Sequence, residues 1–294
     1  MPLTVQEVLT LSTAWLARHG SDTPRLDAEL LTAHALGIKR VDLYLSLERP
    51  ITNEERARLH HVLRRRGSGE PVAYIRGVRE FYGIELLVAR GVLIPRPETE
   101  VLVDEVLRLL AGLGGAPLVA DVGTGSGAIA CAVAIRDPRV RVIATDISQV
   151  AVEIARKNCE RLGLVGRVEV RHCDLLDAVP REPCLDVVVS NPPYVAEGEV
   201  PLLDKSVRDF EPREALLAGP DGMAVTKRLL GEAVVRLVPG GSLVLEVGSR
   251  TQAGLTESLL QHTAGLTGVR ALKDAAGAIR GYSASKVAQC TGAA

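Results

Sequence analysis

From Ala116 onward, short apolar segments alternate with segments of helical periodicity, and this alternation limits the fold more than any other feature. The apolar segments are 117–122, 139–146, 167–174, 185–190 and 241–248, and the helical ones are 128–136, 150–163, 226–238 and 251–265. Two further strand patterns, 269–274 and 281–286, follow. Apolar strands separated by helices are typical of a parallel sheet with both faces covered. We therefore predict an α/β domain with a Rossmann-like sheet over residues 96–294.

The beginning of the chain has the pattern of short helices. Thr4 and Thr52 each precede a glutamate at the spacing of a capping box, which marks a helix N-terminus. Between them, Thr23 stands before a proline suited to the first helical position, and Gly37 is the expected stop. We predict a small helical domain over residues 1–67.

The last of these helices ends in Arg64, Arg65 and Arg66. Such a triplet can form a patch for nucleic acid. It can also place cations at a helix C-terminus, where the helix dipole favours them. The surrounding residues include many acids, so the second explanation is favoured.

Residues 68–95 connect the two predicted domains and have β character. The segments 71–77 (PVAYIRG) and 81–89 (FYGIELLVA) are rich in β-branched and aromatic residues, and we predict that they pair as a β-hairpin. The next helix pattern begins near Pro97, with Glu98 and Glu100 in its first turn, where the helix dipole favours acidic side chains.

Composition limits the partners of the chain. Its 294 residues carry a formal net charge of −1, whereas domains that bind nucleic acid usually show a strongly basic surface. The cysteines stand apart without a C-x-x-C pair, so we predict no metal site and no disulfide framework. They are Cys131, Cys159, Cys173, Cys184 and Cys290.

We expect a cytoplasmic protein. No apolar run approaches the roughly 20 residues that a helix needs to cross a bilayer. The first helix carries Glu7 and Arg18, unlike the apolar core of a signal peptide. We also expect a monomer without direct contact to nucleic acid or membrane.

A glycine-rich loop follows the first strand of the α/β domain and opens a helix. It has the form D-x-G-x-G-x-G, and its candidate cofactor-binding residues are Asp121, Gly123, Thr124, Gly125, Ser126 and Gly127. Glycines let the backbone turn sharply and approach a ligand closely. The next strand ends in Asp146, about 20 residues further on, where a carboxylate can accept both hydroxyl groups of a ribose. Loop and acid together indicate a nucleoside site, and a plain glycine-rich turn is the alternative.

Two cofactors fit this loop. Gly125 to Ala130 matches G-x-G-x-x-A, a dinucleotide fingerprint. Asp121 argues against a dinucleotide, because a carboxylate before the loop repels a pyrophosphate and suits the ammonium group of S-adenosylmethionine. Asp174, at the end of the third strand, is a candidate for the adenine edge, and a helix cap is its alternative role. We predict S-adenosylmethionine as the cofactor.

Asn191-Pro192-Pro193-Tyr194 directly follows the apolar strand 185–190, at the same sheet edge as the glycine loop. The prolines lack N–H groups, so the turn presents carbonyl oxygens without competing donors. Together with the side-chain oxygen of Asn191, these carbonyls match the two donors of a planar –NH2 group. Tyr194 offers an aromatic wall. We predict Asn191, Pro192 and Tyr194 as catalytic residues, and Asn191, Pro192, Pro193 and Tyr194 as substrate-binding residues.

This combination of motifs is the pattern of class I methyltransferases that act on planar amide or exocyclic nitrogens. One alternative is a DNA adenine methyltransferase, which flips its target base out of the duplex. That enzyme needs a cationic surface along the phosphates, which the near-neutral charge does not favour. A second alternative is a non-catalytic module that binds S-adenosylmethionine.

Several longer motifs resemble one family. They are GEPVAYIRGVREFYGIELLV, VLIPRPETE, DVGTGSGAIA, SNPPYV, FEPREALLAGPDGM and PGGSLVLEVG. Together they resemble the HemK/PrmC family, the S-adenosylmethionine-dependent glutamine methyltransferases of class-I peptide chain release factors. The resemblance runs from about Gly69 to Gly248. Members have a small N-terminal helical domain that helps to dock the release factor, and this role falls on residues 1–67.

The resemblance implies roles for individual residues. The loop Gly123–Gly127, Asp146 and Asn191 would hold S-adenosylmethionine. Asn191–Tyr194 would also cradle the glutamine of the Gly-Gly-Gln loop of the release factor, and Arg96–Thr99 would line the pocket. Leu175 is a further candidate for the cofactor, at a position where many members carry a large aromatic residue.

Overall fold

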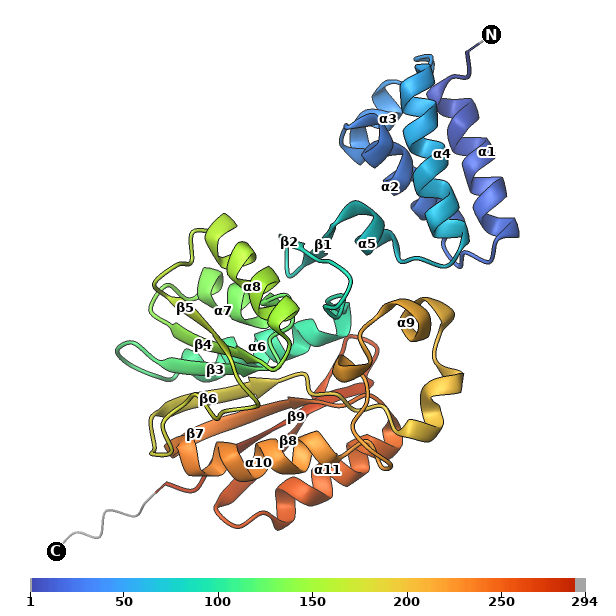
Figure 1. The fold of residues 1–294 in the computed structure, drawn as a ribbon. Coiled ribbons are helices and arrows are strands. Elements are labelled where there is room, and N and C mark those ends of the chain that lie inside the picture. The colour runs from blue at the N-terminus through green and yellow to red at the C-terminus, as the bar shows by residue number, and fades with distance from the viewer. Residues whose placement is uncertain (1, 289–294) are drawn as a thin grey trace, which may run out of the picture. The chain divides into compact units, whose positions relative to one another are not determined.

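The computed structural model describes residues 2–288, and these residues divide into two compact units (Figure 1). The first unit comprises the chain up to Val78 together with Asp204–Phe210, and the second comprises Arg79–Leu203 and the chain from Glu211 onward. The predicted domain limits of 1–67, 68–95 and 96–294 stay predictions, because compactness alone does not define a domain.

Helices form the first unit. They are α1 (Val5–Arg18), α2 (Pro24–Leu36), α3 (Arg40–Leu45), α4 (Asn53–Gly67), α5 (Val72–Arg76) and α9 (Lys205–Phe210). The capping boxes predicted at Thr4 and Thr52 are both formed, and Gly37 ends α2 with a φ of 70°. The apolar faces meet in a core that includes Val5, Leu31, Leu43, Leu59 and Ile75. The predicted helical region is confirmed.

The arginine triplet lies in the last turn of α4, as the helix-dipole explanation requires. Arg65 forms an ion pair with Glu70 at 2.8 Å, and Arg66 forms one with Asp27 at 2.7 Å. Both contacts are internal to the first unit, so these side chains stabilise the helical fold.

The predicted hairpin is present, but one of its strands was placed wrongly. Residues 72–76 form α5, and the strands are β1 (Val78–Phe81) and β2 (Ile84–Leu87). Tyr82 and Gly83 between them have φ values of 51° and 75°, which is the backbone of a tight hairpin turn. Tyr74 and Ile75 are buried, and this burial outweighs the strand preference of their side chains.

A seven-stranded sheet forms the centre of the second unit, in the order β5-β4-β3-β6-β7-β9-β8. Its strands are β3 (Leu118–Val122), β4 (Arg141–Asp146), β5 (Val168–His172), β6 (Leu185–Ser190), β7 (Leu237–Glu246), β8 (Leu266–Lys273) and β9 (Ile279–Lys286). The neighbouring strands from β5 through β4, β3 and β6 to β7 pair in parallel. Strand β9 runs antiparallel to both β7 and β8. The α/β sheet expected from the alternating pattern is confirmed.

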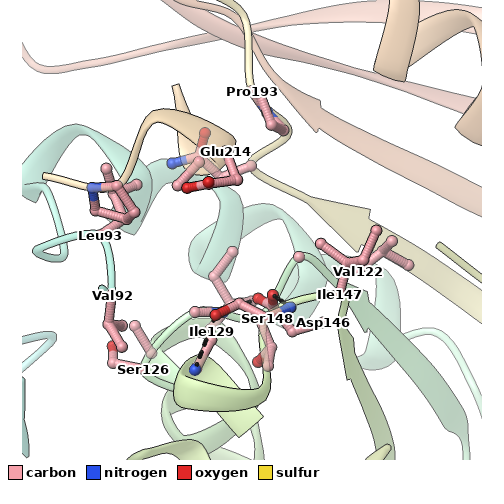
Figure 2. A pocket seen from close by; sticks show the side chains of 18 of the residues that line it. Val92, Leu93, Val122, Ser126, Ile129, Asp146, Ile147, Ser148, Pro193 and Glu214 are labelled. Carbon is pink, nitrogen blue, oxygen red and sulfur yellow. Dashed lines mark hydrogen bonds between the residues drawn. The ribbon is translucent and has the colours of Figure 1, made fainter. Parts of the chain in front are cut away.

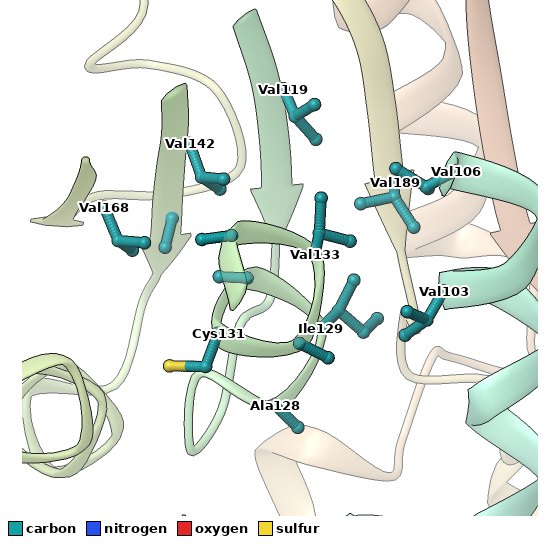
Figure 3. Close-up of a cluster of buried hydrophobic side chains, with 14 of the residues drawn as sticks. Val103, Val106, Val119, Ala128, Ile129, Cys131, Val133, Val142, Val168 and Val189 are labelled. Atoms are coloured by element: carbon teal, nitrogen blue, oxygen red, sulfur yellow. The ribbon is translucent and has the colours of Figure 1, made fainter. Parts of the chain in front are cut away.

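Helices cover both faces of this sheet (Figure 1). One face packs against α6 (Glu100–Leu110), α7 (Ala128–Arg136) and α8 (Gln149–Arg161), and the other packs against α10 (Ala224–Arg236) and α11 (Arg250–His262). Short 3-10 helices are η1 (Pro97–Thr99), η2 (Glu197–Leu202) and η3 (Arg213–Ala215). Figure 3 shows Val119 and Val189 of the strands directed toward Val103, Val106 and Val133. Each fully buried side chain of this kind stabilises the fold by roughly 1.5–3 kcal/mol.

The strand order reverses at β3. From β3 the chain continues to β4 and β5 on one side of it, and then returns to β6 on its other side. Ligands of open parallel sheets bind at the carboxyl ends of the strands, at such a switch point. The glycine loop follows β3, and Asn191 follows β6, so the topology brings both motifs to this point.

The lengths of the helices and the state of the cysteines relate to the expectations drawn from composition. None of the helices within residues 2–288 combines the length and the apolar character needed to cross a membrane. Cys131, Cys159, Cys173 and Cys184 are free thiols, and Cys290 lies outside the described residues.

Candidate active site

A cavity of about 530 Å³ opens at the carboxyl ends of β3, β4 and β6 (Figure 2). This volume lies within the range of small-molecule sites, roughly 300–1,000 Å³. All lining residues belong to the second unit. Pro193 and Glu214 lie across the cavity from Ser126 and Ile129 (Figure 2).

Most residues predicted from the sequence line this cavity. They are Gly123, Thr124, Gly125, Ser126, Asp146, Asp174, Leu175, Asn191 and Pro193. Asp121, Gly127, Pro192 and Tyr194 do not line it. Asp121 and Pro192 are buried, and Gly127 is the N-cap of α7. The predicted residues therefore fall into two groups: those that line the cavity and those that lie behind its wall.

The glycine loop is held by backbone hydrogen bonds. Gly123, Gly125 and Gly127 have φ values of 70°, 57° and 81°, a region that residues with a Cβ rarely adopt. The N–H groups of Gly123 and Thr124 donate to the Thr145 carbonyl oxygen at 2.8 and 2.9 Å. The loop is therefore tied to the end of β4, and its shape requires glycine.

Asp146 stands at the carboxyl end of β4 and faces the loop. Its Oδ2 accepts the Gly125 N–H at 2.8 Å, and its Oδ1 accepts the Ser148 N–H at 2.9 Å. Burial raises the pKa of this carboxyl, and the two backbone donors oppose that rise. Each carboxylate oxygen keeps acceptor capacity beyond its one backbone donor, as a diol ligand would need.

Asp121 lies beneath the glycine loop and is fully buried. Its Oδ2 accepts the Thr124 hydroxyl at 2.6 Å and the Ala130 N–H at 3.0 Å. Its Oδ1 has no hydrogen-bond partner among the residues that the structure describes. Burial raises the pKa of Asp121 to about 6. The carboxylate supports the loop and leaves one oxygen unsatisfied.

The Asn-Pro-Pro-Tyr turn is fixed by the backbone that follows it. The N–H groups of Tyr194 and Val195 donate to the Leu216 carbonyl oxygen at 3.1 and 2.7 Å. Burial raises the pKa of the Tyr194 hydroxyl to about 12, so the phenol stays protonated at neutral pH. The Tyr194 ring packs directly against Gly248, where any Cβ would overlap it. The turn therefore has one defined conformation.

Asn191 and Thr99 both line the cavity. The Asn191 side-chain Nδ2 donates to Thr99 Oγ1 at 3.2 Å. Glu246 lies at the end of β7, where burial raises its pKa to about 7 and the Thr99 side chain opposes that rise. Glu246 is buried, and its Oε2 has no hydrogen-bond partner within the described part of the chain. The Asn191 carbonyl oxygen is left available to the cavity.

The segment 96–99 lines the cavity through Arg96 and Thr99, as the resemblance implied. Arg96 forms an ion pair with the buried Glu211. Glu211 also accepts the Ile94 N–H at 3.2 Å, so the segments around residues 94 and 211 are joined.

Several lining residues were not predicted. Ile147 and Ser148 follow Asp146 at the same strand end, and this adjacency is a signal that could have found them. Arg228 of α10 pairs with Asp174 at 2.6 Å across the cavity wall. No sequence signal separates Arg228 from the other charges of its helix.

The donor set fits a nucleoside with a cationic group better than a dinucleotide. The cavity holds the Asp146 carboxylate, and Asp121 lies close behind it with an unsatisfied oxygen. The lining arginines, Arg96 and Arg228, are both engaged by carboxylates, which reduces their attraction for phosphate. These residues fit S-adenosylmethionine, which carries a sulfonium and an ammonium group and no phosphate.

Comparison with known proteins gives consistent results. Residues 7–77 match the family described as PrmC N-terminal domain, and residues 99–206 match the methyltransferase small domain. The release factor glutamine methyltransferase of Rhodopirellula baltica is 44% identical, over 97% of this chain and 97% of its own. That of Koribacter versatilis is 42% identical, over 84% of this chain and 87% of its own. A methyltransferase structure from Pyrococcus furiosus covers 70% of this chain and 90% of its own, with 22% identity and a TM-score of 0.50.

The sheet order, the glycine loop and the cavity at the switch point define a class I S-adenosylmethionine-dependent methyltransferase. The extent of identity to curated relatives places the chain more narrowly. It belongs to the HemK/PrmC family, the release factor glutamine methyltransferases.

Proposed function

We propose that this protein transfers a methyl group from S-adenosylmethionine to the side-chain amide nitrogen of glutamine in the Gly-Gly-Gln motif of class-I peptide chain release factors. The names of its curated relatives support the reaction and the substrate protein. One observation carries the assignment to this site: Asn191 lines the cavity and donates one hydrogen bond from Nδ2 to Thr99 Oγ1, so its side-chain oxygen is free for a substrate –NH2 group.

Asn191 and the Asn-Pro-Pro-Tyr turn orient the substrate amide. A primary amide nitrogen has two hydrogens, and the Asn191 oxygen together with a carbonyl oxygen of the turn accepts both. Prolines at 192 and 193 bring no N–H groups that would compete for these oxygens. The Tyr194 ring supports the turn from behind, against Gly248. Two accepted hydrogens hold the nitrogen in one plane and turn its face toward the cofactor.

The glycine loop, Asp146, Asp174 and Leu175 would hold the cofactor. When bound, S-adenosylmethionine supplies an electrophilic methyl group on a sulfonium sulfur. Asp146 would accept the ribose hydroxyls, and Asp174 would lie at the adenine edge. Asp121 supports the loop through Thr124 and Ala130 and would supply negative charge for the ammonium group. All of these residues except Asp121 and Gly127 lie on the wall of the same cavity, which supports a shared ligand.

The chain's own contribution to the rate is alignment. The amide nitrogen forms a bond to the methyl carbon, the carbon–sulfur bond breaks with its electron pair on sulfur, and one amide proton leaves to solvent. Proper alignment of reacting groups can lower the barrier by roughly 7–11 kcal/mol. By accepting an amide hydrogen, the Asn191 oxygen also polarises the N–H bond and so raises electron density on the nitrogen.

We further propose that the helical first unit docks the release factor. Residues 7–77 match the N-terminal domain of the family, which supports this role. Its exposed apolar side chains, Leu11, Val41, Tyr44 and Leu45, offer surface for a protein partner.

Mass spectrometry of a class-I release factor after incubation with enzyme and isotopically labelled S-adenosylmethionine tests the function. We expect one labelled methyl group on the glutamine of the Gly-Gly-Gln peptide, and none when that glutamine is replaced by glutamate. Asn191→Ala should lower transfer by about a hundredfold or more, as loss of one precisely placed polar group does elsewhere. Its affinity for S-adenosylhomocysteine should stay near wild type.

Duplex DNA containing adenine serves as the second substrate in the same assay. Label in DNA and none in the release factor would make the adenine methyltransferase alternative correct. Label in neither would refute both activities.

A further inference from the structure

Gln252 is a buried side-chain amide that the reaction outlined above does not use. It lies in the first turn of α11, and only 5% of its surface is exposed. Its Oε1 accepts the Gly248 N–H at 2.6 Å, and its Nε2 donates to the Gly222 carbonyl oxygen at 3.2 Å. The side-chain oxygen of an amide only accepts and its nitrogen only donates, so these two partners fix the orientation of the group. One side chain therefore joins two backbone segments that are far apart in the chain.

These two segments enclose Tyr194, the last residue of the Asn-Pro-Pro-Tyr turn. A Cβ at Gly248 would overlap the Tyr194 ring, and a Cβ at Gly222 would overlap the Tyr194 carbonyl oxygen. One glycine thus lies against the ring and the other against the backbone of the same residue. By joining the two glycines, the Gln252 amide sets the separation between the two surfaces that hold Tyr194.

The turn has few means of fixing its own backbone. Pro192 and Pro193 have no N–H group, so neither can donate a backbone hydrogen bond. The residue before the turn, Ser190, is fixed at the end of β6, where its hydroxyl donates to the Val122 carbonyl oxygen at 2.7 Å. The positions of the carbonyl oxygens within the turn therefore depend on how firmly its other end, Tyr194, is held.

We propose that Gln252 is a positioning residue for methyl transfer. Its hydrogen bonds to Gly222 and Gly248 hold Tyr194 in place, and with it the carbonyl oxygens of the turn that accept the hydrogens of the substrate amide. This inference rests on the proposed function, in which those oxygens orient the glutamine nitrogen. Without the two hydrogen bonds the glycine segments can separate and the turn can shift. A displacement of about 1 Å at an aligned reacting group can lower a rate by about a hundredfold.

A helix cap is the alternative role for Gln252. Ser249 is the N-cap of α11, and its hydroxyl accepts the Gln252 N–H at 3.2 Å. A glutamine or glutamate at this position commonly returns a hydrogen bond to the backbone at the start of the helix, and the bond to the Gly248 N–H is similar to that arrangement. Capping does not account for the second hydrogen bond, which reaches the Gly222 carbonyl oxygen in a different segment.

The turn and the cofactor can be separated by experiment. Tyr194, Gly222, Gly248 and Gln252 are not among the residues that line the cavity. Loss of the positioning role should therefore appear in kcat and not in the affinity for S-adenosylhomocysteine. A general loss of structure in the second unit would weaken both.

Gln252→Met and Gln252→Glu test the proposal in the full-length enzyme with a release factor as substrate. Methionine has a similar length and removes both hydrogen bonds, so kcat should fall about tenfold to a hundredfold. The KM for the release factor should stay near wild type, because the proposed docking surface lies in the first unit. Glutamate keeps an oxygen for the Gly248 N–H but places its second oxygen against the Gly222 carbonyl oxygen, so it should also lower kcat. A helix cap accepts glutamate as readily as glutamine, so capping alone predicts a wild-type kcat for this variant.

The combination of Gln252→Met with Gly248→Ala tests whether the effect passes through Tyr194. Both changes displace the same residue, so their effects on kcat should overlap. We expect the double variant to be slowed by much less than the product of the two single effects. Independent, multiplying effects would contradict the proposed route through Tyr194.

Ser249→Ala is the matched control. It removes the N-cap hydroxyl of the same helix and leaves both hydrogen bonds of the Gln252 side chain in place. Thermal stability should fall, because the cap is lost, while kcat stays unchanged. Amide hydrogen exchange adds a local measurement, since the N–H groups of Tyr194 and Val195 donate to the Leu216 carbonyl oxygen. Exchange at these two amides should be faster in Gln252→Met and unchanged in Ser249→Ala.

Wild-type kcat in Gln252→Met would overturn the proposal, as would a loss confined to thermal stability or to cofactor affinity. A slow Gln252→Met together with a wild-type Gln252→Glu would assign the helix cap instead. If Gln252→Met does not fold, kcat of Gln252→Glu decides alone. A wild-type enzyme that leaves the release factor unlabelled would refute the proposed function itself, whereas a labelled release factor with unaffected variants would refute only the role of Gln252.

Discussion

Asp121 and Asp146 lie on the neighbouring strands β3 and β4, but their burial and hydrogen-bond partners differ. Asp146 lines the cavity, and each of its oxygens accepts one backbone N–H. Asp121 is fully buried, with one oxygen unsatisfied among the described residues. An unsatisfied buried oxygen costs stability, about 1–3 kcal/mol. Asp121 is therefore retained at a cost that the fold alone does not explain, in agreement with a role toward a cationic ligand.

Asp121→Asn should change how stability depends on pH. The pKa of Asp121 rises from its ordinary value of 3.8 to about 6 on folding, so its protonated form is favoured in the folded chain. Its contribution is complete below pH 3.8 and is lost as the pH rises through about 6. Urea unfolding between about pH 4 and pH 7 should show a decline of roughly 2 kcal/mol in wild type that the variant lacks.

Asp137→Asn provides a control of opposite sign. The Arg139 side chain, through its hydrogen bonds, lowers the pKa of Asp137. The contribution of Asp137 to stability is thus present above the ordinary pKa of 3.8 and lost as the pH falls. An identical decline with pH in wild type and Asp121→Asn would show that Asp121 does not titrate in this range.

At the scale of elements, the sequence predicted the helices and strands that follow from local hydrophobic periodicity. Every strand from β3 to β9 and the helices α7, α8, α10 and α11 overlap the predicted segments, but β7 begins at Leu237, within the segment 226–238 that was predicted as a helix. The segment 72–76 was predicted as a strand and is α5. Its β-branched and aromatic residues favour a strand locally, but burial of Tyr74 and Ile75 decides the outcome. Preference alone cannot reveal such tertiary contacts.

The site shows the same division. Residues at the carboxyl ends of β3, β4 and β6 were predictable, because parallel strands end at one edge. Thr99 reaches Asn191 only through the position of η1, at the start of a different helix. Arg228 of α10 pairs with Asp174, and both residues line the cavity. These contacts join residues far apart in the chain, and no spacing in the sequence encodes them.

The connection after β7 supports the Asn-Pro-Pro-Tyr turn, and Gly248→Ala tests this support. A Cβ at Gly248 would overlap the Tyr194 ring, which cannot move freely because it is largely buried. We expect methyl transfer to fall by about tenfold or more, since small displacements of aligned groups have large effects on rate. Affinity for S-adenosylhomocysteine, measured by calorimetry, should not change, because neither residue lines the cavity.

Gly254→Ala is the control for this substitution. Gly254 lies within α11, and a Cβ there would meet no atom within 4 Å. Alanine should raise helix stability by about 0.5–1 kcal/mol and leave transfer unchanged. Equal rates in Gly248→Ala and wild type would mean that the position of Tyr194 does not matter to the reaction.

At the scale of the whole molecule, the chain separates two tasks. Every residue that lines the cavity belongs to the second unit, and the match to the N-terminal family domain falls within the first. The first unit has its own apolar core, distinct from the two clusters on the faces of the sheet. The proposed cofactor site thus belongs to the second unit, and the proposed docking of a protein substrate belongs to the first.

Hydrogen–deuterium exchange with two ligands tests this division in the full-length protein. Saturating S-adenosylhomocysteine should slow amide exchange in the loop 123–127 and around Asp146, because a ligand at 100 times its Kd stabilises the folded state by about 2.7 kcal/mol. Exchange in α1–α4 should be unchanged. A release factor should instead slow exchange in the first unit, and a variant with the glutamine of its Gly-Gly-Gln motif replaced should still do so. Uniform slowing of both units by S-adenosylhomocysteine would show that they respond as one body. If the release factor left the first unit unaffected, the docking role would be wrong while the cofactor assignment stood.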